Sequence, residues 1–475
     1  MSRLGATWMA LTQTALVGAQ LLLLPLQVRQ WGAAATAQWS AAIAVASIMS
    51  ASDLGLKAFG HAALGEAARA GLPPDASFTA IWAALRLLMG SIALLGVTGA
   101  WTVSVLGGGA TPVWLVWLVA AFAIEGLLLA RIMYMDTLGL IARAEGCYAM
   151  MLWLRLLTAA TALKAFDAPP ATLAMIYAVS ALVGLTAQSI ALRGHPALRL
   201  TAGGFRAIGI DTFWLLRYSM AYPLANWCRI SLPVLVLNTV AQAALVNAYV
   251  ALRAVFGFLR AVVLNVGRYT SVQFMDAAAL RRRRLLLWCI GSIVLCTAFA
   301  LGVVLDAGAL LSRWVPGIST AGYEWMSLSF SLAAPFFACE ILLLTWMRDG
   351  GEQHVARLHF VYVLLALLSV SACLATRSMH VYLAAWLVVE VGFGVTVVAR
   401  TRQFGVGMPV LRTAASGVAL VLVCFAAVQG TELLHSGEGF AHLSQRLAFF
   451  AALSSLMLLQ LRHWAREPIA TEGGL

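Results

Sequence analysis

The chain has 475 residues, of which 62% are hydrophobic and only 11% are charged. A soluble protein of this length carries roughly twice that charged fraction, so the composition excludes an ordinary soluble enzyme or binding module. The formal net charge of +12 comes from arginines that fall mainly between apolar runs. We therefore attribute the basic charge to attraction to anionic lipid and expect no nucleic acid as a partner.

The apolar runs are long enough to cross about 30 Å of hydrocarbon, and the alternation of period two that marks a membrane barrel is absent. The sequence thus predicts an all-α, polytopic membrane protein with about fourteen spans. The first run follows Arg3 and exceeds the usual core of a signal peptide, so we interpret it as an uncleaved span. The expected spans are 5–27, 38–60, 77–102, 113–133, 145–166, 171–193, 212–237, 243–275, 284–306, 324–347, 358–376, 379–399, 411–430 and 444–461.

The distribution of basic residues predicts the orientation. With the N-terminus inside, eighteen arginines fall in or beside the inside connections and four basic residues fall outside. Positive residues gather on the cytoplasmic side of membrane proteins. We therefore expect both termini in the cytoplasm.

A basic, glycine-containing connection at 194–210 follows the first six spans. We interpret it as a cytoplasmic hinge between an N-terminal lobe of six spans (1–193) and a second lobe of six spans (211–400). The remaining residues, 401–475, hold two further spans and a cytoplasmic tail. No outside connection exceeds roughly twenty residues, so no large external domain is expected.

Charged residues lie inside the predicted spans, where each costs at least about 2.5–3.5 kcal/mol and needs a partner or a wet cavity. Two interpretations stay open: structural ion pairs between helices, or groups that line a transport cavity. Arginines outnumber carboxylates here, which leaves some arginines without an acidic partner. The residues are Asp53, Lys57, Arg86, Glu125, Arg155, Arg229, Arg253, Arg260, Arg268, Glu340 and Glu390.

The run 243–275 carries arginines at 253, 260 and 268, spaced seven and eight apart, which places them on one helix face over roughly 22 Å. Guanidinium groups suit the oxygens of phosphate and pyrophosphate. Arg268 can also reach the cytoplasmic surface by snorkelling. As candidates for an anion-binding cavity we take Arg86, Arg155, Arg229, Arg253 and Arg260.

Pro223 and Pro233 flank Arg229 in the seventh run. Each proline removes a backbone donor and kinks a helix, and kinked helices that line a midplane site are typical of transporters. An ordinary membrane-helix proline is the other interpretation.

The sequence contains no nucleotide-binding G-x-x-x-x-G-K-[ST] loop, no Cys or His spacing for a metal, and no Ser/His/Asp or DxD cluster. We therefore expect no cofactor, no metal and no enzymatic activity. Energy would come from a gradient of H⁺ or Na⁺, or from removal of the product on the far side. Glu125, Glu340 and Glu390 are candidate proton sites.

Two segments resemble Wzx-type polysaccharide flippases, members of the multidrug/oligosaccharidyl-lipid/polysaccharide (MOP) exporter superfamily. Residues 23–56, "LLPLQVRQWGAAATAQWSAAIAVASIMSASDLGL", are similar to the family's first two spans. Residues 215–260, "LLRYSMAYPLANWCRISLPVLVLNTVAQAALVNAYVALRAVFGFLR", are similar to its seventh and eighth. The order of spans agrees over about the first 400 residues.

This resemblance implies a two-lobed fold in a bacterial cytoplasmic (inner) membrane. It implies that the protein moves a polyprenyl-diphosphate-linked oligosaccharide from the inner to the outer leaflet by alternating access, with a polysaccharide polymerase as a further partner. It also implies that Asp53 and Lys57 lie near the cytoplasmic mouth of the first lobe. We hypothesise that they form a gate contact in the outward-facing state. If so, apolar substitution of both should change the labelling of that mouth by cytoplasmic thiol reagents.

Three other functions stay open. A multidrug or cation exporter of the same fold needs carboxylates in its cavity, and this chain has more arginine than acid within its spans. A membrane enzyme of polysaccharide assembly, such as a polymerase, acyltransferase or glycosyltransferase, usually carries a large outside loop or a catalytic motif. A structural scaffold would not explain so many charges within spans.

Overall fold

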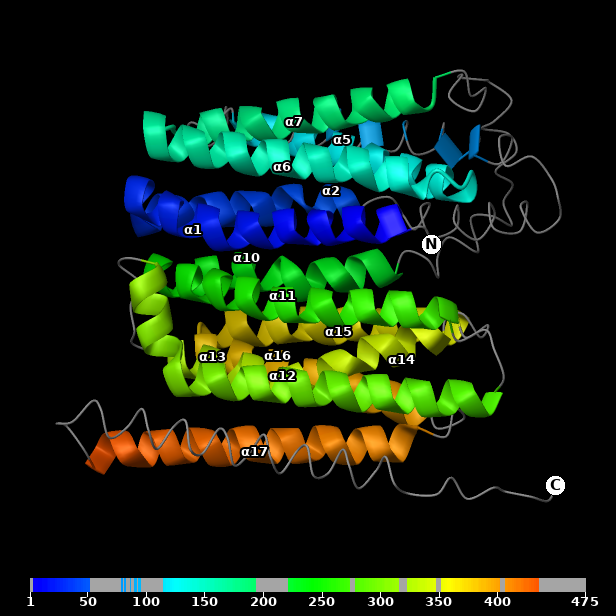
Figure 1. Cartoon of the computed structure of the whole chain (residues 1–475). Coiled ribbons are helices and arrows are strands. Elements are labelled where there is room, and N and C mark those ends of the chain that lie inside the picture. The colour runs from blue at the N-terminus through cyan, green and yellow to red at the C-terminus, as the bar shows by residue number, and fades with distance from the viewer. Residues whose placement is uncertain are drawn as a thin grey trace. The chain divides into compact units, whose positions relative to one another are not determined.

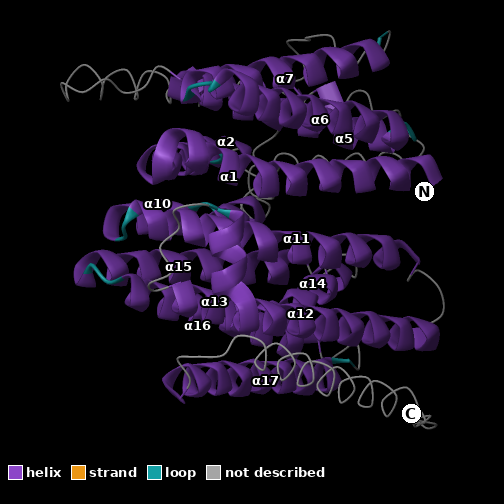
Figure 2. Cartoon of the chain, turned by 60° about the vertical axis from the view of Figure 1, so that its left-hand side comes forward, coloured by secondary structure: helices purple, strands orange, loops and turns teal. Residues whose placement is uncertain are grey.

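The computed structural model describes residues 3–51, 114–193, 221–273, 278–315, 323–346, 352–401 and 406–434, together with part of 78–94. Within these residues all regular structure is helical (Figures 1 and 2). Ten helices of the described chain are long and apolar enough to cross a membrane. The chain is therefore an all-α, multi-pass membrane protein, as predicted. The predicted hinge at 194–210 and the predicted span at 444–461 lie outside the described residues.

The predicted spans that fall within the described residues correspond closely to the helices; most of the predicted span 77–102 lies outside them. For example, the runs 145–166, 171–193 and 379–399 form α6, α7 and α16. Apolar runs of this length form helices because only the helix satisfies its own backbone groups within lipid. The helices are α1 (Arg3–Ala46), α2 (Ile48–Ala51), α5 (Trp114–Thr137), α6 (Ile141–Phe166), α7 (Pro170–Ala191), α10 (Leu232–Val240), α11 (Ala243–Gln273), α12 (Ala278–Trp314), α13 (Tyr323–Ala333), η2 (Ala334–Ala338), α14 (Cys339–Trp346), α15 (Glu352–Thr376), α16 (Met379–Arg400) and α17 (Gly407–Leu434).

The first two predicted spans meet within α1 at a single break. Gly32 has φ 77° and ψ 172°, a conformation that is essentially restricted to glycine. The hydroxyl of Thr36 donates to the carbonyl of Gly32 at 2.8 Å and so stabilises the start of the second half. The predicted turn between the two spans therefore reduces to one residue.

Two predicted spans are interrupted by proline. In the seventh, residues 221–230 are helical, Ser231 forms a turn, and α10 begins at Leu232 with Pro233 in its first turn. This confirms the predicted kink at Pro233, whereas Pro223 lies within the helical residues 221–230. In the run 324–347, α13 and α14 are separated by the 3₁₀ segment η2, which contains Pro335. A proline has no N–H for the α-helical bond, so the chain tightens or turns there.

The chain divides into two compact units. The first comprises Met1–Ala254, Trp314–Ser319 and Glu352–Met379, and the second comprises Val255–Arg313, Thr320–Gly351 and His380–Leu475. The division passes through α11, between Ala254 and Val255. The lobe boundaries taken from the sequence stay a prediction.

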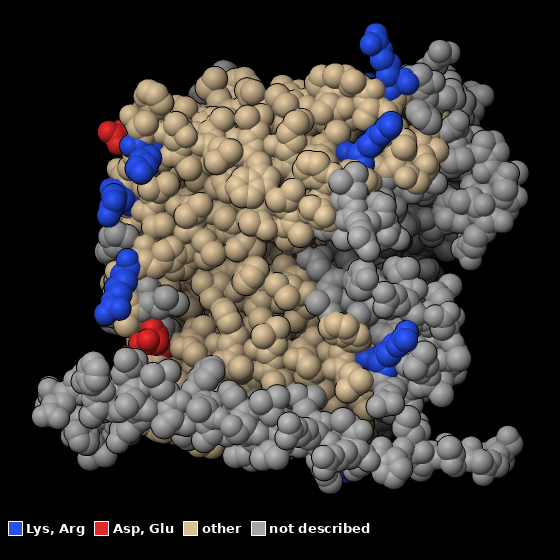
Figure 3. Space-filling model, viewed as in Figure 1, with Lys and Arg blue, Asp and Glu red and all other residues tan. Residues whose placement is uncertain are grey.

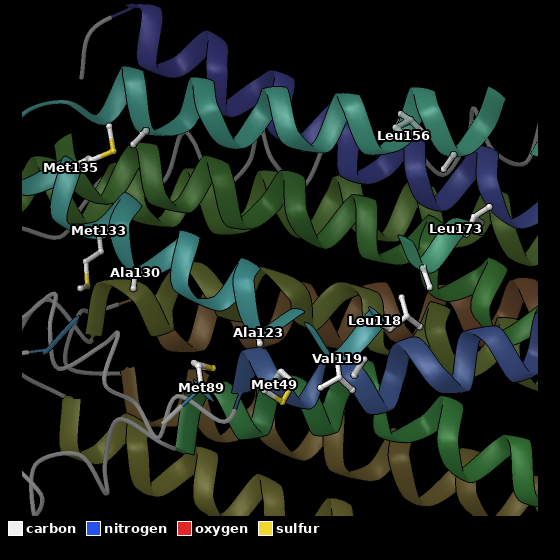
Figure 4. Close-up of a cluster of buried hydrophobic side chains, with 14 of the residues drawn as sticks. Met49, Met89, Leu118, Val119, Ala123, Ala130, Met133, Met135, Leu156 and Leu173 are labelled. Atoms are coloured by element: carbon white, nitrogen blue, oxygen red, sulfur yellow. The ribbon is translucent and has the colours of Figure 1, made fainter. Parts of the chain in front are cut away.

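The core of the first unit lies where α1 packs on α6 and where α5 packs on both α6 and α7. Figure 4 shows part of this core, including Met49, Met89, Leu118 and Leu156, all of which are buried. Small residues permit the close approach of these helices, since membrane helices gain their association energy mainly from tight packing. On the face shown in Figure 3, the coloured charges lie toward the ends of the helices, and the described surface between them is uncharged, as a bilayer requires.

Candidate functional site

The first unit contains a cavity of about 260 Å³ among α1, α5, α6, α7 and α11. Ligand sites for small molecules usually span about 300–1,000 Å³, so this cavity is slightly smaller than such a site. Aliphatic and aromatic residues together form most of its lining. The polar and aromatic lining residues are Gln20, Gln27, Trp39, Ser40, Phe122, Glu125, Arg155, Tyr177 and Arg253.

Glu125 of α5 and Arg155 of α6 form an ion pair in the wall of this cavity. The Nη1 of Arg155 lies 2.9 Å from the Oε2 of Glu125, and both side chains are largely buried. The hydroxyl of Tyr148 donates to the other carboxylate oxygen of Glu125 at 3.0 Å. A buried carboxylate needs such partners, because an isolated charge in this environment is strongly disfavoured.

Further contacts hold the Arg155 guanidinium in place. Its Nε donates to the hydroxyl of Ser180 at 3.1 Å. Its central carbon lies 4.5 Å from the ring centre of Tyr177, which is a cation–π contact. Both partners lie on α7, so Arg155 connects α5, α6 and α7 while it faces the cavity.

Arg253 of α11 also lines the cavity, and its position depends on the break before α10. Its Nη1 donates to the carbonyl of Ile230 at 2.6 Å. In a continuous helix that carbonyl would accept from the amide of Val234, but the Val234 amide bonds to Ser231 instead. The interruption next to Pro233 thus frees an acceptor that fixes Arg253. Two guanidiniums and one carboxylate then line one cavity, with one positive charge in excess.

The other candidate arginines lie away from this cavity. Arg86 is exposed, and its guanidinium carbon lies 6.0 Å from the ring centre of Trp82. The guanidinium carbon of Arg229 lies 4.8 Å from the ring centre of Tyr362. Neither residue lines the cavity.

In the second unit, Arg260 and Glu340 form an ion pair with an Nη2–Oε1 distance of 2.5 Å. Glu390 is buried on α16. The sequence left open whether membrane arginines pair with acids or line a cavity, and both arrangements occur: Arg155 does both, whereas Arg260 is paired. Arg268 lies in α11 with its side chain outside the described residues, and Asp53 and Lys57 also lie outside them.

Sequence reasoning missed the uncharged part of the cavity wall. Gln20 and Gln27 lie seven residues apart on the face of α1 that lines the cavity. Trp39 and Ser40 also line it, from the part of α1 that follows Gly32. Amide side chains seven apart in an apolar run were the available signal. Arg131, near the end of the predicted span 113–133, is buried in α5, where its Nη1 donates to the carbonyl of Leu185 at 3.0 Å.

Comparison with known proteins identifies the fold. No protein-family model matches the chain, and no curated protein is detectably similar to it in sequence. Among solved structures, the chain is similar to the lipid II flippase MurJ in its inward closed conformation, with a TM-score of 0.67, 9% identity, and coverage of 98% of this chain and 100% of that one.

Two MATE transporters are also similar in structure. The Vibrio cholerae transporter VcmN in its bent form gives a TM-score of 0.54 at 12% identity and covers 89% of this chain and 98% of its own. A eukaryotic MATE transporter gives 0.51 at 15% identity and covers 88% of this chain and 100% of its own. The chain therefore has the fold that MATE transporters and MurJ share.

Proposed function

We propose that this protein is a Wzx-type flippase of the MOP superfamily, and not an enzyme. It moves a polyprenyl-diphosphate-linked oligosaccharide from the cytoplasmic to the outer leaflet of the bacterial inner membrane, for the export of a polysaccharide. The cargo's diphosphate binds in the first-unit cavity at Arg155 and Arg253. A polysaccharide polymerase would receive the cargo on the outer side.

The observation that carries this proposal is the charge of the cavity within this fold. Two guanidiniums and one carboxylate line it, so an anion can be held there while a cation is repelled by the excess positive charge. The similarity to a lipid flippase extends over nearly the whole chain and gives the higher TM-score. Fold similarity alone does not select a cargo, so the cavity chemistry decides between the candidates.

The cation exporter is the second candidate, because Glu125 lines the cavity and MATE transporters share the fold. Against it, both oxygens of Glu125 already accept hydrogen bonds, from Tyr148 and Arg155. A cationic drug would have to displace the guanidinium of Arg155 to reach this carboxylate. An anionic cargo meets Arg253 without displacing another charged group that lines the cavity.

The protein would move the cargo by alternating access. A gradient of H⁺ or Na⁺, or removal of the product on the far side, would supply the energy. Glu125, Glu340 and Glu390 are the candidate coupling groups, and Asp53 with Lys57 the candidate gate. Arg86, Arg229 and Arg260 stay candidates for contacts in other conformations of the cycle.

The test is a leaflet-transfer assay in liposomes. Purified protein is reconstituted with a fluorescent polyprenyl-diphosphate sugar, and a membrane-impermeant quencher measures the fraction of cargo in the outer leaflet over time. The proposal predicts transfer by the wild type above the rate of protein-free liposomes. Arg253→Ala and Arg155→Ala should each lower the rate by at least roughly tenfold, because each removes a charge-assisted contact worth about 1.5–3 kcal/mol.

Arg29→Ala is the matched control, because Arg29 is an exposed arginine of the same unit that does not line the cavity. It should transfer at the wild-type rate. Wild-type protein that is folded and yet moves no more cargo than empty liposomes would contradict the flippase function. Equal losses in all three variants would contradict the assignment of the diphosphate to this cavity.

A further inference from the structure

The cavity has an uncharged wall that the diphosphate does not require. Gln20, Gln27 and Ser40 line it from α1, whereas the charged groups come from α5, α6 and α11. On α1 the lining residues include Leu16, Gln20, Leu24 and Gln27, which lie on one helix face, and the two glutamines are separated by about 10 Å along the axis.

Gln27 is the most informative of these residues. Its side chain is only 5% exposed, lines the cavity, and has no hydrogen-bond partner among the residues that the structure describes. Gln20, which is exposed, and Ser40, which is half-buried, also have no hydrogen-bond partner within the described chain, although water can reach them more easily than Gln27. A primary amide offers two donors and one acceptor, and leaving it unpaired in an apolar protein interior costs stability. A ligand that hydrogen-bonds to this amide would offset that cost.

A buried indole adjoins these amides. Trp39 lines the cavity, and its ring centre lies 5.4 Å from that of Trp114 and 6.0 Å from that of Tyr177, which also lines the cavity. The ring of Trp39 is therefore rigidly held, and its buried Nε1 has no hydrogen-bond partner among the described residues. Indole N–H groups, amides and hydroxyls all bind sugar hydroxyls.

We propose that Gln20, Gln27 and Ser40, with Trp39, form a carbohydrate subsite that reads the sugar attached to the cargo's diphosphate. The proposal rests on the function given above and adds to it the residues that select the glycan. A cavity of about 260 Å³ holds one sugar-sized group beside the guanidiniums, and not an oligosaccharide. Selection at this subsite would therefore depend on the sugar nearest the diphosphate.

The test measures equilibrium binding to purified protein in nanodiscs with two kinds of probe. One is a bare short-chain prenyl diphosphate, and the other is the same diphosphate carrying glucose, galactose or N-acetylglucosamine. The wild type should bind at least one glycosylated probe more tightly than the bare one. Gln27→Met, which keeps the length of the side chain, should lower the affinity for that probe roughly fivefold to tenfold. It should leave the affinity for the bare diphosphate unchanged.

Two controls separate the possible outcomes. Arg253→Ala should lower the affinity for both probes. Gln38→Met, at an exposed position of α1 that does not line the cavity, should change neither affinity. Wild-type protein that binds no probe would contradict the proposed function itself. Binding of the bare diphosphate with no gain from any sugar, or an equal loss of both probes in Gln27→Met, would overturn the subsite and leave the diphosphate function standing.

Thermal unfolding of Gln27→Met distinguishes a ligand-binding amide from a structural one. Since Gln27 has no partner among the described residues, the variant should unfold at or above the wild-type temperature. A marked loss of stability would show that the amide holds the helices together, and would overturn the assignment to sugar.

Discussion

Arg155 contacts three helices through one guanidinium, and its ion pair with Glu125 decides the charge of the cavity. The carboxylate of Glu125 neutralises Arg155 and holds it in position. The other guanidinium of the cavity, that of Arg253, contacts a backbone carbonyl and no carboxylate among the described interactions. Buried pairs of this kind are strongly destabilised by the loss of one partner, because the other charge then stays buried and uncompensated.

A double-mutant cycle tests this pairing. Arg155→Met and Glu125→Gln should each lower the free energy of unfolding, by roughly 3–5 kcal/mol. The double variant should lose clearly less than the sum, since it leaves no unpaired charge. Chemical unfolding in detergent measures the three values, with the exposed Arg193→Met as a neutral control. Additive losses would contradict a direct interaction.

At this scale the sequence predicted the right residue types but not their partners. Glu125, Arg155 and Arg253 were named because charges in apolar runs are costly, and the structure brings these three together. Tyr148, Ser180 and the Ile230 carbonyl were not predicted, since contacts between distant segments leave no trace in the spacing of one chain.

At the scale of the element, glycines decide where helices bend and how closely they pack. Gly32 has a positive φ, and a Cβ at this position would meet no atom within 4 Å. The cost of a side chain there is therefore purely a matter of backbone strain.

Gly32→Ala should lower the free energy of unfolding by roughly 1–3 kcal/mol, because the new residue must adopt a conformation that only glycine tolerates. Gly291→Ala is the matched control: Gly291 lies inside α12, and its added Cβ would also meet no atom within 4 Å. This control should be neutral or stabilising by up to about 1 kcal/mol. Equal effects of the two substitutions in thermal unfolding would show that the break at Gly32 is not strained.

Gly184 on α7 allows α5 and α6 to pack closely against α7. A Cβ there would lie 2.7 Å from Leu128 of α5 and 3.1 Å from Met151 of α6. Gly184→Leu should therefore force the three helices apart and lower the free energy of unfolding by roughly 1–3 kcal/mol. Gly392→Leu on α16 meets open space and should change little. A stable Gly184→Leu variant would contradict this packing.

Helix positions were predictable because the length of an apolar run reflects the thickness of the bilayer. The interruptions were predictable only in part. Pro233 was expected to kink its helix and does, whereas the 3₁₀ segment at Pro335 was not anticipated. The merging of two spans at Gly32 was also missed, because a single glycine gives no signal that it alone will form the turn.

At the scale of the whole molecule, the excess of inside arginines predicts the orientation. Single cysteines in a cysteine-free background can test it at the two ends of α7. Lys164→Cys, at the end of α6 that leads into α7, should react with a membrane-impermeant maleimide added outside intact cells without their outer membrane. Arg193→Cys should react only after the membrane is opened. Both positions are exposed, so a reversed pattern would contradict the predicted orientation and not merely reflect burial.

The proposed flippase function depends on the sign of the cargo's charge, and one experiment measures it directly. The same liposomes, holding wild-type protein, are assayed in parallel for leaflet transfer of a polyprenyl-diphosphate sugar and for movement of a permeant cationic dye under an imposed H⁺ or Na⁺ gradient. We predict transfer of the sugar lipid above the protein-free rate and no protein-dependent movement of the dye. Movement of the dye without transfer of the sugar lipid would contradict the flippase function and assign the Arg155–Glu125 pair to a cation exporter.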